Sequence, residues 1–148
     1  MECVIFIGIQ ASGKTEFYKR NFFKTHVRIN LDMLRTRHRE DVMLSACIEA
    51  KQPFVVDNTN PTAKDRSKYI VAAGQGRFKI IGYYFQTNLE GALERNENRS
   101  GKERLERAAI LGTHKKLELP SVKEGFDELK YVRIADGFNF TVEDYCEI

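Results

Sequence analysis

One octapeptide limits the folds open to this chain more than any other feature of its sequence. Residues 8–15 read Gly-Ile-Gln-Ala-Ser-Gly-Lys-Thr and fit the pattern G-x-x-x-x-G-K-[ST]. The apolar run 3–7 precedes them, and helical sequence begins near Gly13. A loop of this length between a strand and a helix wraps a phosphate group with consecutive backbone N–H groups, and the positive end of the helix dipole points at the same anion. The expected phosphate contacts are Gly8, Ala11, Ser12, Gly13, Lys14 and Thr15.

Two side chains of the octapeptide suit a triphosphate bound with a metal ion. Lys14 is expected to reach the β- and γ-phosphates as a point charge, and the Thr15 hydroxyl to bind the Mg²⁺ that bridges them. Asp57 follows the apolar run 53–56 and is expected at a strand end, where a carboxylate holds the magnesium shell. A simple turn at residues 57–60 is the alternative explanation for Asp57. The sequence therefore predicts ATP and Mg²⁺ as ligands, with Thr15 and Asp57 at the metal.

Apolar runs alternate with helical patterns along the whole chain, and no repeat, low-complexity tract or linker interrupts them. This alternation predicts an α/β fold with a mainly parallel sheet, in a single domain over residues 1–148. The expected strands are 3–7, 27–30, 53–57, 77–85 and 129–134. The expected helices begin near residue 13 and then cover 33–50, 60–73, 89–98 and 102–117, with Asn60 and Asn88 as N-caps. In the second helix, one buried stripe is expected to contain Val42, Met43, Ala46 and Ala50.

Composition narrows the class of protein further. The 148 residues are 42% hydrophobic and 30% charged, which is enough to bury a sizeable core. The chain has no apolar run long enough for a membrane helix and no basic n-region, so we expect a soluble cytoplasmic protein. Its three cysteines, Cys3, Cys47 and Cys146, are widely spaced, and we interpret them as reduced thiols. The net charge of +3 argues against a protein that coats nucleic acid non-specifically.

A single acid stands in an otherwise basic segment. Residues 19–39 hold one carboxylate, Asp32, and seven basic residues: Lys19, Arg20, Lys24, Arg28, Arg35, Arg37 and Arg39. Asp32 follows the expected strand 27–30 and therefore faces the same sheet edge as the phosphate loop, which suits a general base. Arg35 lies one helical turn later and would grip a phosphate or carboxylate of the acceptor. A helix cap at Asp32 and a solvated basic face are the alternatives.

The residues from about 88 to 117 are expected to form a lid. Arg95 and Arg99 are four residues apart on a polar helix whose apolar seam is only Leu89 and Leu93. Two guanidinium groups at this spacing can clamp phosphoryl oxygens when a mobile cover closes over them. Surface salt bridges with Glu94 and Glu97 are the alternative.

Five stretches carry a family resemblance. They are the phosphate loop 8–15, the segment Asn30-Leu31-Asp32-Met33-Leu34-Arg35, the segment Asp57-Asn58-Thr59-Asn60-Pro61 with Arg66 and Tyr69 after it, the segment 95–99, and the stretch 119–126. They resemble the kinase domain of the polynucleotide 5′-hydroxyl kinase family, which includes the bacteriophage end-healing kinase and its animal repair counterpart. The resemblance covers nearly the whole chain.

The resemblance implies a P-loop fold like that of adenylate kinase, with ATP as the donor and a nucleic-acid 5′ end as the acceptor. It implies that Asp32 activates the acceptor 5′-hydroxyl, that Arg35 engages the acceptor's phosphate, and that Arg66 also belongs to the substrate-binding set. It also implies that Arg95 and Arg99 act on the ATP phosphates, so that Lys14, Asp32 and Arg99 are the catalytic residues. One stretch departs from the family, because residues 101–107 continue as charged helical sequence where many members have a Val-Pro or Ile-Pro step.

Three functions therefore stay open at this point. The first is an ATP-dependent polynucleotide 5′-hydroxyl kinase, with DNA and RNA not distinguished. The second is a P-loop kinase of a small metabolite or nucleoside, which the modest net charge favours because a long nucleic-acid footprint needs more positive surface. The third is a non-catalytic nucleotide-binding regulator, against which Asp32 and the two lid arginines argue.

Overall fold

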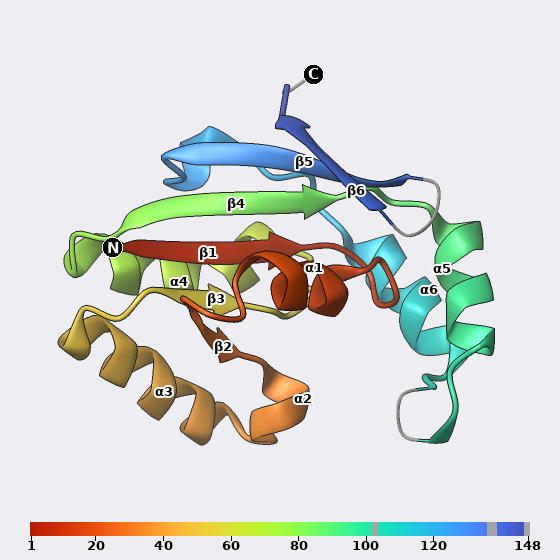
Figure 1. The fold of residues 1–148 in the computed structure, drawn as a ribbon, viewed down its shortest axis with the longest axis horizontal. Helices are drawn as coiled ribbons and strands as arrows, with labels where there is room; N and C mark the ends of the chain where they lie inside the picture. The colour runs from red at the N-terminus through yellow and green to blue at the C-terminus, as the bar shows by residue number, and fades with distance from the viewer. Residues whose placement is uncertain (102–103, 136–138, 147–148) are drawn as a thin grey trace.

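The computed structural model describes residues 1–101, 104–135 and 139–146. The described residues form one six-stranded sheet in the order β2-β3-β1-β4-β5-β6 (Figure 1). The strands are β1 (Glu2–Ile7), β2 (Val27–Ile29), β3 (Phe54–Val56), β4 (Lys79–Phe85), β5 (Glu128–Ala135) and β6 (Asn139–Asp144). Pairs among β1 to β5 are parallel, and β6 pairs antiparallel with β5. The α/β fold with a mainly parallel sheet is therefore confirmed.

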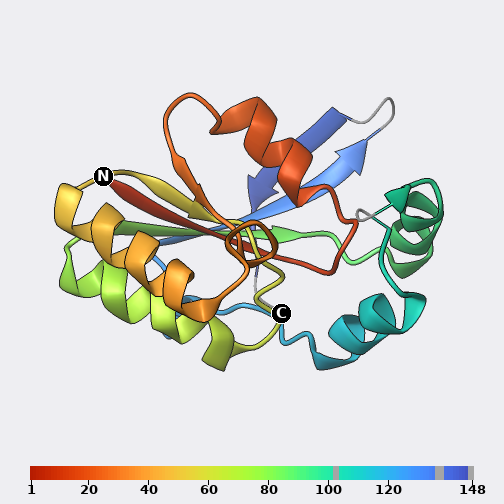
Figure 2. The ribbon, with the colours of Figure 1, turned by 90° about the horizontal axis from the view of Figure 1, so that it is seen from below.

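The central strand β1 is buried on both faces, and its alternating side chains divide the core in two. Cys3, Ile5 and Ile7 pack against α3 (Arg37–Ala50) and α4 (Ala63–Gln75). Val4 and Phe6 point to the opposite face and pack against α1 (Lys14–Asn21). Figure 2 shows the same division, with α1 on one side of the sheet and α3 and α4 on the other. Strands covered on both faces need nearly continuous apolar sequence, as β1, β3 and β4 have.

The carboxyl ends of the parallel strands define the functional edge. The phosphate loop, the short helix α2 (Leu31–Leu34) and the chain after β3 all follow strand ends at this edge. Helices α5 (Leu89–Glu97) and α6 (Arg107–Lys116) lie beyond it, to the right in Figure 1. A 3-10 turn, Val122–Glu124, precedes β5. Among the described residues, no helix is both long and apolar enough to cross a bilayer.

The structure corrects the expected helix 33–50, which is two helices rather than one. Helix α2 ends at Leu34, because the next residue, Arg35, has a φ of 76° that is incompatible with a continuing helix. Helix α3 then restarts behind Thr36, whose side chain accepts a hydrogen bond from Arg39 N. The predicted buried stripe is also wrong. Val42, Ala46 and Ala50 are exposed and Met43 is partly buried, whereas the buried residues of α3 are Glu40, Leu44 and Cys47. The stripe was missed because it includes a charged residue.

Other boundaries were also misjudged. Thr62, not Asn60, caps α4, in a reciprocal capping box with Asp65. Asn60 has a φ of 46° and donates its side-chain amide to Phe6 O at 2.8 Å. Residues 104–106 are not helical, and residues 102–103 lie outside the described part. The cap at Asn88 is confirmed, since it accepts a hydrogen bond from Gly91 N at 3.0 Å. Strand β6 had no predicted counterpart.

Candidate nucleotide and acceptor site

The phosphate loop connects β1 to α1 and is held in place by backbone contacts. Gly8 N donates to Thr59 O at 3.0 Å, which ties the loop to the chain after β3. A side chain at Gly8 would come within 3.0 Å of Phe85 Cβ, so this position needs glycine for close approach. Gly13 has a φ of 93° just before α1 begins. The loop is thus rigidly placed at the N-terminus of a helix, where anions bind.

Lys14 is buried and folded back onto the loop that it would serve. Its Nζ donates to Gly8 O at 3.0 Å and to Ile9 O at 2.6 Å. Burial lowers the pKa of Lys14 to about 8; Asp57 and Asp32 act to raise it, and Arg99 acts to lower it. The three charged groups therefore all lie within Coulombic range of the Lys14 ammonium. The structure thus brings residues of the phosphate loop, of α2, of the chain just after β3 and of the chain just after α5 to one place.

Thr15 and Asp57 form a direct pair. The Thr15 hydroxyl donates to Asp57 Oδ2 at 3.1 Å, and the Asp57 side chain is almost completely buried. Both oxygens are hard ligands of the kind that Mg²⁺ prefers, and their position at the base of the phosphate loop fits a nucleotide-bound metal. The residues present therefore suit the predicted metal.

An arginine that the sequence reasoning gave no role completes this pair. Arg28 Nε lies 2.9 Å from Asp57 Oδ2, and Arg28 Nη2 donates to Thr15 Oγ1 at 3.2 Å. Alternation along β2 places Arg28 on the α1 face, where its guanidinium also lies 6.0 Å from the Tyr18 ring. The only signal for Arg28 in the sequence was its place in the basic segment, which indicates a charged residue but not where its side chain points.

Asp32 and Arg35 lie on the exposed side of the site. Asn30 caps α2 by accepting from Met33 N at 2.9 Å, and Asp32 is the second residue of that helix. The expectation that Arg35 lies one helical turn after Asp32 is wrong, because α2 ends before Arg35 and the chain turns there. Both side chains are exposed, so they meet solvent where Lys14 and Asp57 do not.

Helix α5 lies against the phosphate loop. Ala92 packs with Ile110 onto Ile9 and Ala11, and the predicted seam of Leu89 and Leu93 packs, partly buried, against the same cluster. Arg95 Nε donates to Ala11 O at 2.6 Å. The expected lid is therefore docked on the loop.

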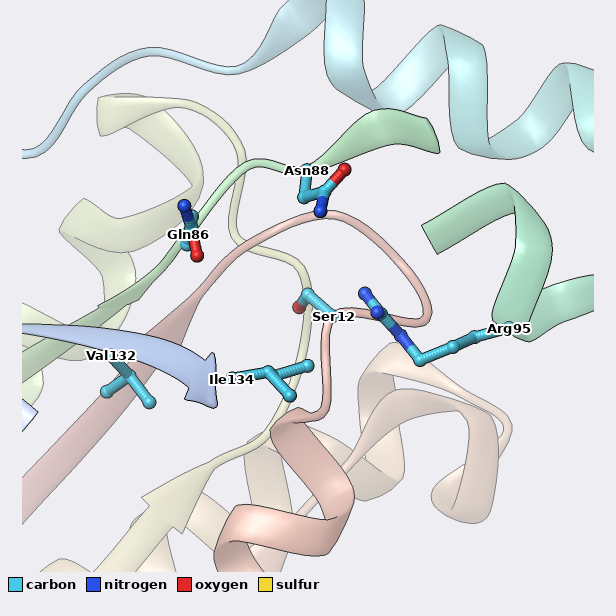
Figure 3. Close-up of a pocket in the computed structure, with 6 residues that line it drawn as sticks. All are labelled: Ser12, Gln86, Asn88, Arg95, Val132 and Ile134. Atoms are coloured by element: carbon cyan, nitrogen blue, oxygen red, sulfur yellow. The ribbon is translucent and has the colours of Figure 1, made fainter. Parts of the chain in front are cut away.

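Arg95 reaches from α5 into a small recess beside the loop. The recess has a volume of about 100 Å³ (Figure 3), and its lining residues are Ser12, Gln86, Asn88, Arg95, Val132 and Ile134. Burial, followed by the charge of Arg99, lowers the pKa of Arg95. The two guanidinium groups therefore repel each other, which an anion bound between them would relieve.

Arg66 does not lie where a substrate-binding residue is expected. Its guanidinium is fully buried and donates to both carboxylate oxygens of Glu124, at 2.8 and 3.0 Å. It also donates to Asn60 O at 2.9 Å and to Glu118 O at 3.2 Å. With its donors taken up inside the fold, Arg66 joins α4 to the chain before β5. The structure therefore gives it a structural place.

A family model for the AAA domain, AAA_33, matches residues 3–120. The chain belongs to this family. The match spans the phosphate loop, Asp32, Asp57, α5 and α6, which together form the candidate site.

Individual proteins are also similar to this chain. The bifunctional polynucleotide phosphatase/kinase of Schizosaccharomyces pombe is 28% identical over 138 residues, which cover 88% of this chain and 33% of that protein. The chain thus spans about a third of the length of this curated relative. A gluconokinase from Sinorhizobium meliloti has a TM-score of 0.66 at 18% identity, covering 93% of this chain and 85% of its own. Kti12 of Chaetomium thermophilum, in complex with ADP-AlF3, has a TM-score of 0.65 at 18% identity, covering 90% of each chain. The chain has a P-loop kinase-like fold.

Proposed function

We propose that this chain is an ATP-dependent kinase that transfers the γ-phosphate to the 5′-hydroxyl of a polynucleotide. The observation that carries the proposal is the convergence of charge at Lys14. One ammonium lies within Coulombic range of the carboxylates of Asp32 and Asp57 and of the Arg99 guanidinium. A kinase needs this combination: cations for the moving phosphoryl group, a metal-binding carboxylate, and a second carboxylate free to accept a proton.

Each residue then has a defined task. The loop amides and Lys14 hold the β- and γ-phosphates, with Lys14 exchanging its contacts with Gly8 O and Ile9 O for phosphate oxygens. Mg²⁺, held at Thr15 and Asp57, would neutralise charge between those phosphates. Asp32 accepts the proton of the acceptor hydroxyl while that oxygen forms its bond to the γ-phosphorus and the bond to the ADP oxygen breaks. The Arg99 guanidinium stabilises the negative charge of the phosphoryl group during transfer, and Arg95, on the docked helix α5, adds a second positive charge.

The polynucleotide acceptor is proposed from two observations. The relative from Schizosaccharomyces pombe carries polynucleotide kinase in its name, and it matches over most of this chain. In addition, three exposed arginines follow Asp32 within seven residues, namely Arg35, Arg37 and Arg39. A cationic surface beside the base suits an acceptor that carries phosphates along its length.

Phosphate transfer from γ-labelled ATP tests the acceptor directly. The protein is incubated with Mg²⁺ and either DNA or RNA oligonucleotides bearing a 5′-hydroxyl, and in parallel with a free nucleoside and with gluconate. We expect label on the oligonucleotides and at most a trace on the small molecules. Transfer to a small molecule without transfer to either polynucleotide would replace the proposal with a small-molecule kinase.

The role of Asp32 needs its own variant. Asp32→Asn keeps the size of the side chain but removes the proton acceptor, so we expect turnover to fall by a factor of about 10² or more while ATP affinity is unchanged. Asp144→Asn, an exposed aspartate on β6, is the matched control and should retain full turnover. Near-normal turnover of Asp32→Asn would remove this residue from the mechanism.

A further inference from the structure

Helix α2 carries the proposed base, and its apolar packing is only partial, with Leu34 partly buried against the main core cluster. It has only four residues, and none of them is fully buried. A one-turn helix is not stable by itself, so its position must come from specific contacts with the rest of the molecule. The orientation of Asp32 therefore depends on the groups that bond to the backbone around it.

At the end of α2, Arg39 Nη1 donates to Leu34 O at 3.2 Å. The contacts at its start come from the two residues that follow β3. Asp57 N donates to Ile29 O at 2.8 Å, and Asn30 Nδ2 donates back to Asp57 O at 2.5 Å. The third contact uses the side chain of Asn58, whose Oδ1 accepts a hydrogen bond from Leu31 N at 2.9 Å. Leu31 is the first residue of α2 and directly precedes Asp32. Its N–H belongs to the first turn of a helix, where no carbonyl of the same helix can accept it.

A buried carboxylate fixes which way the Asn58 amide faces. Asn58 Nδ2 donates to Glu40 Oε2 at 3.1 Å and to the Tyr69 hydroxyl at 3.3 Å. An ionised carboxylate only accepts hydrogen bonds, so the NH₂ group must face Glu40 and the oxygen must face Leu31. Glu40 thereby selects the one amide orientation that can hold the start of α2.

Glu40 is itself held in its charged form. Its side chain is fully buried, and its Oε1 accepts from Arg37 Nη1 and from Lys68 Nζ, both at 3.0 Å. Burial acts to raise the pKa of Glu40, but the hydrogen bonds from Lys68 and Arg37 outweigh it and leave the pKa below its usual value. A carboxylate buried with two cations and an amide is costly to build unless every partner is satisfied. Here the arrangement links α3 and α4 to the chain beside the site.

We propose that Asn58 is a positioning residue for the base, and that Glu40 acts through it by orienting its amide toward Leu31 N. The inference rests on the proposed function, because it assigns to Asn58 an effect on the reaction of Asp32. Neither Asn58 nor Glu40 needs to touch a substrate for this. Their contribution is to keep α2 in the position that holds the Asp32 carboxylate within Coulombic range of Lys14.

A double-mutant cycle tests whether Asn58 acts through Asp32. Asn58→Ala should lower turnover about tenfold while ATP affinity stays unchanged, because the phosphate loop keeps its own contacts. In the Asp32→Ala background the same substitution should change the residual turnover less than twofold. Asn21→Ala, which removes an asparagine that donates to Phe17 O on the far end of α1, is the control and should leave both rates unchanged. An equal, additive loss in the two backgrounds would overturn the inference.

An exchange of amide and carboxylate tests the orienting role of Glu40. Asn58→Asp alone places two carboxylates against each other and should lower turnover at least as much as Asn58→Ala. Adding Glu40→Gln restores a donor opposite an acceptor, so the double variant should recover to within about threefold of the parent. Failure of Glu40→Gln to rescue, with thermal stability retained, would remove Glu40 from the proposal.

Amide exchange gives a readout that needs no reaction. Hydrogen exchange of the Leu31 N–H, followed by NMR, should be at least tenfold faster in Asn58→Ala than in the parent, while amides of β1 exchange as before. Unchanged protection of Leu31 would overturn the contact on which the inference depends. If the parent protein transfers phosphate to no acceptor, the proposed function fails and the catalytic role of Asn58 fails with it. Additive losses in an active parent refute the positioning role alone.

Discussion

The donor half and the proposed acceptor half of the candidate site are built in different ways. On the donor side, Lys14 and Asp57 are buried, and Thr15, Asp57 and Arg28 already bond to one another. On the acceptor side, Asp32 and Arg35 are exposed on and just after a single turn of helix. Substitutions on the donor side therefore disturb the core, whereas those on the acceptor side disturb mostly what the protein binds.

This difference has a physical cause. A triphosphate offers the same charged oxygens in every kinase, so a rigid cage of backbone N–H groups next to the central strand is a general solution. An acceptor differs from one kinase to another, and exposed side chains on a short helix can change without altering the sheet. The fold thus fixes the place of the nucleotide, and in the proposed function the few residues around α2 select the acceptor.

The largest effect is expected from the donor side. Lys14→Ala removes the buried ammonium of the phosphate loop and should lower turnover by at least about 10³-fold, which corresponds to about 4 kcal/mol. Lys24→Ala, an exposed lysine, should have no effect. Steady-state kinetics with saturating acceptor measure both. A loss below tenfold for Lys14→Ala would mean that the loop amides alone hold the phosphates.

The pH dependence of nucleotide binding tests the role of the Lys14 ammonium in a second way. Burial lowers the pKa of Lys14 to about 8, so the ammonium predominates below that pH and the neutral amine above it. Binding of ATP to the free protein without Mg²⁺ favours the charged form, so affinity should fall as the pH rises above 8. Calorimetric titrations between pH 7 and 9.5 should show this fall, and Lys14→Gln should lack it. An equal slope in Lys14→Gln would assign the titration to another group.

The variant Arg66→Ala tests whether Arg66 has a structural role or a role in acceptor binding. Its removal leaves Glu124 without its bidentate partner and should lower the free energy of unfolding by about 3 kcal/mol. This value is near the lower end of the cost of breaking a buried ion pair, because Glu124 keeps some contact with water. Urea unfolding of Arg66→Ala measures this loss. Below the unfolding transition, the KM for the acceptor should match that of the parent. A raised acceptor KM with unchanged stability would return Arg66 to the acceptor side.

Arg99 is expected to act on the reaction more than on binding. Arg99→Ala should lower turnover by about 10- to 100-fold with little change in the KM of the acceptor, because the guanidinium acts on the phosphoryl group in transit. Arg107→Ala, an exposed arginine at the start of α6, is the matched control. Initial rates over a range of acceptor concentrations separate the two parameters. A rise in acceptor KM at constant turnover would place Arg99 in acceptor binding.

The sequence predicted the parts of this molecule that depend on local patterns. The phosphate loop and the strand before it were predicted correctly, because a glycine pattern and an apolar run act over a few residues. The helix break at Arg35 was missed, because arginine as a residue type does not predict a positive φ. Arg28 and Glu40 were missed as well, because their directions depend on partners far away in the chain.

Arg66 shows the limit most clearly. A family resemblance can mark a residue as one that matters, but it does not distinguish a ligand contact from a buried ion pair. The partner that decides the matter, Glu124, is 58 positions away in the sequence. Only the folded chain brings the two together, and the same holds for Asn58 and Leu31 in the acceptor half.

The smallest expected effect concerns the join between the loop and α5. Ala11 has a φ of 61°, which costs an alanine about 1–2 kcal/mol, so Ala11→Gly relieves strain. The same change removes a methyl group that packs on Ala92 and Ile110, and it raises the conformational entropy of the unfolded chain. Together these two losses are about as large as the strain that is relieved. We expect the free energy of unfolding to change by less than about 1 kcal/mol. Ala92→Gly has no strain to relieve inside its helix and should destabilise by about 2 kcal/mol. Equal losses in the two variants, measured by urea unfolding, would show that the left-handed backbone at Ala11 stores no strain.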